Sequence, residues 1–150
     1  MGGGPICPVP VAKPVLRGRA MHPIALLQAA LVAALDGDAA LVDLIGAGGV
    51  FDAPPRSRPA PYVVIERHDM RQRDGDETPG QEHRVMLHCW SEQPSRKAAL
   101  DIAERVVAAG LALVPVGLTV THGEHVRTET VIDTATGQAR AAVSLRFLSE

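Results

Sequence analysis

The stretch Gln81–Gly110, QEHRVMLHCWSEQPSRKAALDIAERVVAAG, decides the fold class, because it reads as one strand that leads into one helix. From Arg84 to Trp90 the side chains alternate between two faces, and a period of two is typical of a strand with one buried face. The residues predicted to face the core are Val85, Leu87 and Cys89. The other face carries Arg84, Met86, His88 and Trp90.

The second half of this stretch has the signals of an amphipathic helix over residues 95–109. Ser91 and Ser95 are both suitable N-caps, and Pro94 suits a first turn. An apolar stripe at helical spacing is formed by Ala99, Ile102, Ala103 and Val106. Lys97 and Arg105 each stand four residues from Asp101, which predicts salt bridges on the solvent side. Gly110 is predicted to end the helix.

Working outward, helices are predicted at 23–35 and 39–45, capped by Asp38 and closed by Gly46. Strands are predicted at 62–68, 83–90, 118–122 and 140–148, with Val50–Phe51 as a further short strand. After Gly123, residues 126–132 are predicted to continue or restart the strand that begins at Leu118. The last strand should point Ala141, Val143, Leu145 and Phe147 inward. Strands joined by hairpins pair antiparallel. The predicted fold is therefore α+β, with two layers: a mainly antiparallel four-stranded sheet and helices on one face.

The domain organisation is predicted as an extended Pro/Gly-rich arm at 1–20 and a single α+β domain at 21–150. Two explanations of the arm compete: a start codon placed too early, or a segment that orders on a neighbouring subunit. The net charge of −2 and the scarcity of aromatics argue against general capture of duplex or single-stranded nucleic acid. Two cysteines, Cys7 and Cys89, indicate no disulfide framework. We expect no signal peptide and no membrane span.

A search for chemistry predicts no catalytic residue, no metal site and no cofactor. The strongest candidate is His122-Gly-Glu-His125, because two histidines and a carboxylate can bind zinc. In a strand, however, positions 122 and 125 point to opposite faces, which favours a solvated turn. Carboxylates between Asp69 and Glu82 lie in or beside a polar segment, where we expect nothing to desolvate them and shift their pKa values.

Two surfaces are instead candidates for contact with other proteins. The first is the polar segment Asp69–Gly80, predicted to be a long mobile hairpin loop. Its candidate contact residues are Arg71, Arg73, Asp74, Asp76 and Glu77, with Glu82 beside them. The second is the last strand, which ends the sequence and is predicted to be a sheet edge. Its outward residues are Arg140, Ser144 and Arg146.

Four stretches resemble the tail-completion, or tail-terminator, family of long-tailed phages and phage-like particles such as gene transfer agents. They are HPIALLQAALVAALDGDAALVDLIG, VFDAPPRSRPAPYVVI, EHRVMLHCWSEQPSRKAALDIAERV and AAVSLRFLSE, and together they cover most of residues 22–150. The sequence departs from the usual pattern in the arm at 1–20 and in the apolar segment 111–117, where a more polar turn is expected.

The resemblance implies a non-enzymatic structural protein of the particle. It would form a ring, hexameric in the lambda-type proteins, on the head-proximal end of the tail tube. The ring would stop tube polymerisation and join the tail to the head-side connector or stopper, and DNA would pass through its lumen without specific binding. It would be made in the bacterial cytoplasm and act at the head–tail junction. Acidic hairpin residues facing the lumen would let DNA slide.

Three alternatives remain open. A head–tail connector or stopper subunit is the nearest, since it is also a small ring former. A metal-dependent hydrolase would use His122 and His125 as ligands. A small-molecule-binding α+β module would need a concave apolar pocket. Whether the particle is a phage, a prophage tail or a gene transfer agent is not determined by composition.

Overall fold

The computed structural model describes residues 22–74 and 79–150. In chain order its elements are α2 (Pro23–Asp36), α3 (Ala39–Ile45), β1 (Val50–Phe51), β2 (Tyr62–Asp74), β3 (Pro79–Trp90), α4 (Arg96–Leu111), β4 (Val120–Ile132) and β5 (Ala139–Ser149). The arm at 1–20, Met21 and the hairpin tip at 75–78 lie outside the described residues. The predicted order of helices and strands is therefore confirmed over the described chain.

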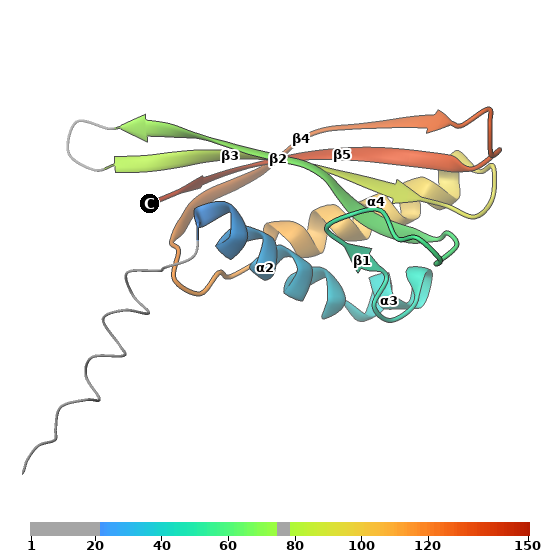
Figure 1. Cartoon of the computed structure of the whole chain (residues 1–150), viewed down its shortest axis with the longest axis horizontal. Coiled ribbons are helices and arrows are strands. Elements are labelled where there is room, and N and C mark those ends of the chain that lie inside the picture. Colours follow the sequence, from blue (N-terminus) through green and yellow to red (C-terminus); the bar gives the residue numbers. More distant parts are fainter. Residues whose placement is uncertain (1–21, 75–78) are drawn as a thin grey trace, which may run out of the picture.

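One sheet holds five strands in the order β1-β2-β3-β5-β4 (Figure 1). The four long strands pair antiparallel, as predicted. The prediction of four strands was incomplete, because β1 joins the sheet parallel to β2, with Val50 opposite Val63. The Pro-rich segment at 52–61 lets the chain leave β1 and return in the same direction. The sheet is therefore mixed.

β5 is an internal strand, so the prediction that it forms an edge was wrong. It pairs with β3 on one side and with β4 on the other. The helix α4 carries the chain away from β3, and β4 enters the sheet one strand position further out. The β4–β5 hairpin then returns β5 into the space between. The exposed edge is consequently β4, and β1 lies at the opposite edge.

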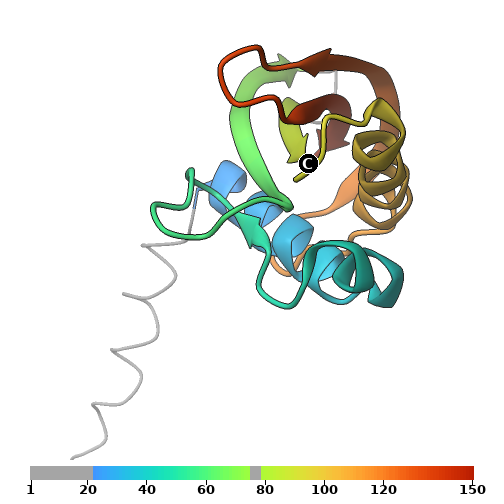
Figure 2. The same cartoon turned by 90° about the vertical axis from the view of Figure 1, so that its right-hand side faces the viewer.

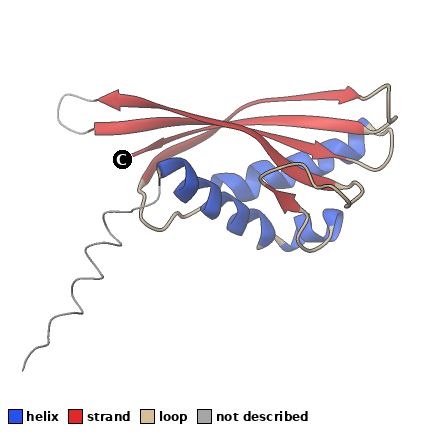
Figure 3. Cartoon of the chain, in the orientation of Figure 1, coloured by secondary structure: helices blue, strands red, loops and turns tan. Residues whose placement is uncertain are grey.

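The three helices lie on one side of the sheet (Figure 3), and the view along the strands shows the sheet curling over them (Figure 2). Their apolar stripes meet the inward side chains of β2, β3 and β5, and Phe147 is the largest fully buried side chain. The inward residues of the quoted strand, Val85, Leu87 and Cys89, are at most 1% exposed, which confirms the predicted alternation. We call the other side of the sheet the open face.

The helix ends follow the predicted caps, with two corrections. Asp38 accepts from the backbone N–H of Leu41, and Ser95 accepts from that of Ala98. Arg105 does not pair with Asp101; its guanidinium instead binds Asp38 at 2.8 and 3.1 Å, which joins α4 to the start of α3. Gly110 does not end α4, which continues to Leu111.

The polar segment predicted as a loop is mostly strand. β2 and β3 stay paired from Asp69 opposite Arg84 out to Asp74 opposite Pro79. This end of the hairpin projects beyond the helices (Figure 1), so both of its faces can meet water. Polar residues then occupy both faces, and the apolar alternation that marks a strand is lost.

No single helix in the described residues is long and apolar enough to cross a membrane. α2 and α3 together have the length and composition, but they are bent by 80° at their junction. Their apolar residues Leu27, Leu31, Leu35, Leu41 and Ile45 are buried in the core.

Candidate assembly surface

Charged side chains from four strands converge on the open face, near the projecting end of the β2–β3 hairpin. The register places Asp69 of β2 opposite Arg84 of β3, and Arg84 opposite Arg146 of β5. Arg146 in turn stands opposite Glu124 of β4. Directly opposed residues on one face of a sheet have Cβ atoms about 5 Å apart, so long charged side chains reach one another. The alternation of each strand therefore assembles a charged surface from distant parts of the sequence.

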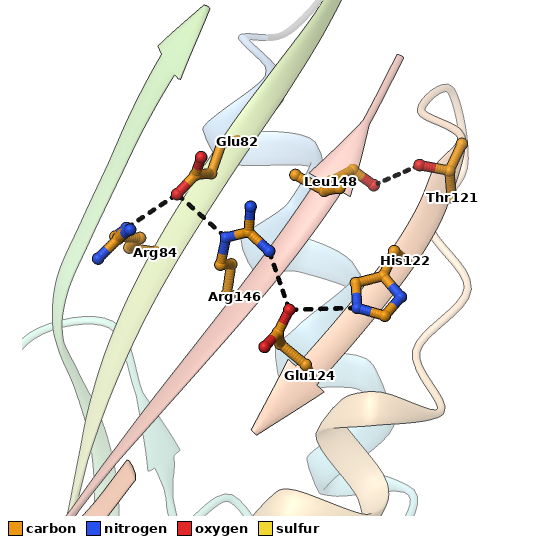
Figure 4. A network of polar contacts seen from close by, with 7 residues as sticks. All are labelled: Glu82, Arg84, Thr121, His122, Glu124, Arg146 and Leu148. Atoms are coloured by element: carbon orange, nitrogen blue, oxygen red, sulfur yellow. Dashed lines mark hydrogen bonds and ion pairs between the residues drawn. The ribbon is translucent and has the colours of Figure 1, made fainter. Parts of the chain in front are cut away.

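Glu82 is the centre of this network (Figure 4). One of its carboxylate oxygens accepts from Arg84 at 2.9 Å and from Arg146 at 3.1 Å. Arg146 also donates to Glu124 at 2.9 Å, and the same Glu124 oxygen lies 3.2 Å from His122. Ion pairs thus connect β3, β5 and β4 across the open face.

These ion pairs favour the charged form of each partner. Hydrogen bonds from Arg146 and then Arg84 lower the pKa of Glu82 to about 2. The same kind of contact, from Arg146 and then His122, lowers the pKa of Glu124. The hydrogen bond to Glu82 raises the pKa of Arg146. Glu82 is only 7% exposed, so this pairing is what allows a carboxylate to lie there.

The structure separates the residues predicted for the hairpin surface. Arg71 and Arg73 are exposed on β2, as a contact role requires. Glu82 is buried and paired, so the expectation that nothing desolvates it was wrong. Asp74 ends β2, and nothing is described of its side chain. Asp76 and Glu77 lie outside the described residues.

The residues predicted for edge contacts share the open face rather than an edge. Arg140, Ser144 and Arg146 stand on β5 opposite Trp90, Met86 and Arg84 of β3. All three are half-buried. Any contact they make with another protein would therefore be through the face of the sheet.

A shallow groove of about 330 Å³ crosses the open face between β2 and β4. Its lining includes Arg67, Asp69, Arg71, Arg84, Met86 and Arg127. The charged residues that line this groove include more arginines than carboxylates. A charged, open groove of this kind suits contact with another polar surface.

The two histidines of the candidate metal motif do not converge. His122 stands opposite Leu148 and His125 opposite Leu145, on opposite faces as predicted. His122 pairs with Glu124, whereas His125 hydrogen-bonds Thr128 at 2.6 Å. Within residues 22–74 and 79–150, no group of three His, Cys, Asp or Glu side chains is placed to hold a metal ion.

Two features were missed by the sequence reasoning. The first is the loop between α4 and β4, where Val114 is 84% exposed and Val116 is 87% exposed. This loop projects at the same end of the molecule as the far end of the β2–β3 hairpin and the C-terminus (Figure 1). The departure noted at 111–117 was the available signal, because apolar residues beside a proline in a connection have no strand or helix to bury them.

The second missed feature is a chain of buried and half-buried hydrogen bonds. His68 Nε2 lies 2.9 Å from His83 Nδ1, and His83 Nε2 lies 3.0 Å from the Ser149 hydroxyl. Ser149 donates to the Gln81 side chain at 2.9 Å, and Gln28 lies 3.3 Å from His68 Nδ1. Extending the alternation of Val85 and Leu87 back to residue 83 would have placed this histidine on the core face.

The family model of the tail completion protein gp17 matches residues 29–150. Among solved structures, a chain from the virion of a native gene transfer agent particle matches with 24% identity and a TM-score of 0.75. That alignment covers 87% of this chain and 99% of the other. The gp17 protein of bacteriophage SPP1 matches with 21% identity and a TM-score of 0.53, over 82% of this chain and 88% of the other. These two likenesses show the fold. No curated protein sequence matches.

Proposed function

The chain belongs to the tail completion protein gp17 family, and from this we propose that it forms a ring of six copies at the head-proximal end of a tail tube. In this role it ends tube polymerisation and joins the tail to a head-side connector, and DNA crosses the lumen. The family match over residues 29–150 carries the proposal. The function is structural and needs no catalytic group.

The shape of the molecule supports an assembly role. The β2–β3 arm, the C-terminus and the apolar loop of Val114 and Val116 project at one end (Figure 1). Exposed apolar side chains rimmed by polar ones mark protein contacts. We propose that this end faces the tail tube, and that Arg71 and Arg73 of β2 contact a neighbouring ring subunit or the tube. A closed ring requires two different surfaces on each copy, one for each neighbour.

The first experiment is the native mass of the purified protein by light scattering after gel filtration, over a range of concentrations. Some proteins of this kind are monomers in solution and form a ring only when they bind the tube. The measurement is therefore repeated with purified tube tips. A mass near six subunits, alone or with tubes, supports the proposal. A monomer that ignores tubes rejects it.

The alternative role as a head–tail connector is separated by the partner. A tail terminator should co-purify with tube protein, whereas a connector should co-purify with portal protein.

The lumen role of the hairpin tip is tested by changing Asp74, Asp76 and Glu77 to Lys. Loss of DNA delivery with rings intact supports a lumen position, and unchanged ring assembly and DNA delivery reject it.

A further inference from the structure

At the end of the sheet opposite the projecting hairpin (Figure 1), an open pocket of about 440 Å³ lies over the ends of three neighbouring strands. Trp90 of β3, Arg140 of β5 and Val131 of β4 stand opposite one another there. The rest of the lining comes from the end of β4 and the turn after it: Ile132, Asp133 and Thr134. The pocket therefore combines a tryptophan and a valine with a single cationic side chain.

Arg140 is unusual because it is half-buried without a partner. None of the ion pairs between described residues includes it. Its Nε–H group is enclosed and has no hydrogen-bond acceptor among the described residues. The other half-buried arginines of the described chain all have acceptors, and they are Arg58, Arg105 and Arg146. Because enclosed donors in folded proteins are almost always paired, the folded chain leaves Arg140 short of an acceptor.

The carboxylates on this part of the open face have other partners. Asp133 accepts a backbone N–H group within the turn between β4 and β5. Glu129 pairs with Arg127 at 2.8 Å. Glu66 lies 3.6 Å from His88. An acceptor for the arginine would therefore have to come from elsewhere.

The remainder of the same chain does not offer a carboxylate at this place. Residues 1–21 contain no Asp or Glu. Asp74, where β2 ends, and Tyr62, which stands opposite Trp90, are about 40 Å apart at the usual rise of a strand. Glu150 follows β5 at the same far end as Asp74. The matching carboxylate therefore belongs to another molecule.

We propose that the pocket of Trp90 and Arg140 binds an acidic side chain of the protein that docks at this end of the molecule. The guanidinium donates charge-assisted hydrogen bonds to the carboxylate, and Trp90 and Val131 contact its methylene groups. Tryptophan and arginine are the residues that most often dominate binding energy at protein interfaces. A nucleic-acid backbone fits less well, because it is bound by several cations together, whereas this pocket holds one cation and Asp133.

This inference rests on the proposed function and names the chemistry of one of its contacts. If the hairpin end faces the tube, the Trp90 end faces the head-side connector. The connector would then present an Asp or Glu side chain to each Arg140 of the ring.

Trp90 gives a direct test, because it is the only tryptophan of the chain and it lines the pocket. The full-length protein is titrated at pH 7 with a hexaglutamate peptide, and tryptophan fluorescence is recorded. We expect a saturable change. Arg140→Gln should weaken binding on the order of tenfold or more, because it removes hydrogen bonds to a charged group. Arg96→Gln removes the same charge at an exposed position on α4 and should bind like the wild type.

The outcomes that overturn the inference are specific. They are the absence of a saturable change, equal binding by the Arg140→Gln and Arg96→Gln variants, and binding of inorganic phosphate as tight as that of hexaglutamate. Urea unfolding checks that each variant is folded. If Arg140→Gln does not fold, Arg140→Lys replaces it, because lysine keeps the charge and lacks the planar fork of donors. Unchanged binding by that variant also overturns the inference.

Binding of purified connector to rings on tube tips keeps the two proposals apart. Arg140→Gln should still form rings on tubes but bind the connector on the order of tenfold more weakly than Arg96→Gln. Rings whose connector binding is unchanged by Arg140→Gln reject the pocket contact and leave the ring standing. Hexaglutamate binding that depends on Arg140, in samples that form no ring with or without tubes, supports the pocket and rejects the ring.

Discussion

At the residue scale, the hydrogen-bond chain through His68 and His83 has one consistent direction. Because the Ser149 hydroxyl donates to Gln81, it must accept from His83 Nε2. His83 Nδ1 then accepts from His68 Nε2, and His68 Nδ1 accepts from Gln28. A second proton on either imidazole would place two N–H groups face to face. The chain therefore requires both histidines to be neutral.

We accordingly predict that acid begins to destabilise the fold at pH values above those at which carboxylates titrate. Burial, and then the neighbouring His83, lower the pKa of His68 to about 4, and burial lowers that of His83. As the pH falls below 6.5 the unfolded chain takes up protons first, so stability present above pH 6.5 is lost progressively toward pH 4. For His68 the loss is about 2 kcal/mol after allowance for solvent screening.

Urea unfolding at pH 7 and pH 5 measures this loss. His68→Gln should flatten the pH dependence, whereas the control His125→Gln, at an exposed position, should leave it unchanged. Equal pH dependence in the wild type and the His68 variant would contradict the prediction.

Glu82 is a second residue whose charge is fixed by its surroundings. Glu82→Gln removes the carboxylate that accepts from both Arg84 and Arg146, and it leaves two guanidinium groups without their shared partner. We predict a lower urea midpoint at pH 7 than for Glu129→Gln, which removes an exposed ion pair with Arg127. Because the pKa of Glu82 is lowered, the difference should persist above pH 4.5 and shrink as the pH falls toward 2. Matching midpoints for the two variants would show that the network adds no stability.

At the element scale, Gly110 shows how closely α4 approaches the sheet. A Cβ atom at this position would lie 3.2 Å from Leu145 Cδ1 and 3.3 Å from Leu31 Cδ1. Both leucines are fully buried, so they have little room to move. The glycine is therefore used inside the helix for close packing, and its position near the end explains why it was mistaken for a stop.

We predict that Gly110→Val destabilises the fold by about 2 kcal/mol, because overpacking costs more than the helix gains from losing a glycine. Ala108→Val, on the exposed side of the same helix, is the matched control and should change stability by about 0.5 kcal/mol or less. Chemical unfolding of both variants measures the difference. A Gly110 variant as stable as the wild type would mean that the two leucines can rearrange.

At the scale of the whole molecule, the exposed valines distinguish assembly from folding. Val114 and Val116 are 84% and 87% exposed, so changing both to Asp should alter the unfolding free energy by no more than about 0.5 kcal/mol each. If this end faces the tube, the double variant should lose tube binding and the ring that depends on it.

The matched control changes Thr134 and Thr136 to Asp in the exposed turn between β4 and β5, at the opposite end of the molecule. Light scattering with and without tube tips compares the two. Tube binding that survives the valine changes would remove this loop from the contact, and unfolding of the valine variant would show a structural role instead.

Much of the fold could be read from local patterns. The N-caps of α3 and α4 and the alternation in β3 and β5 each depend on residues a few positions apart, and the structure confirms them. The candidate surface could be predicted less well. The projecting end of the β2–β3 hairpin was predicted to be a loop because its strands are solvated on both faces. Glu82 was predicted to be exposed because its partner Arg146 is distant in sequence.

The sequence by itself determined the order of helices and strands, the buried side of β3 and β5, and the family. These depend on short-range periodicity and on motif order. Only the tertiary structure decided that β5 lies inside the sheet, that β1 adds a parallel strand, and that Glu82, Arg146 and Glu124 meet. Strand order and side-chain partners depend on where distant segments pack against one another, and no local pattern in one chain records that choice.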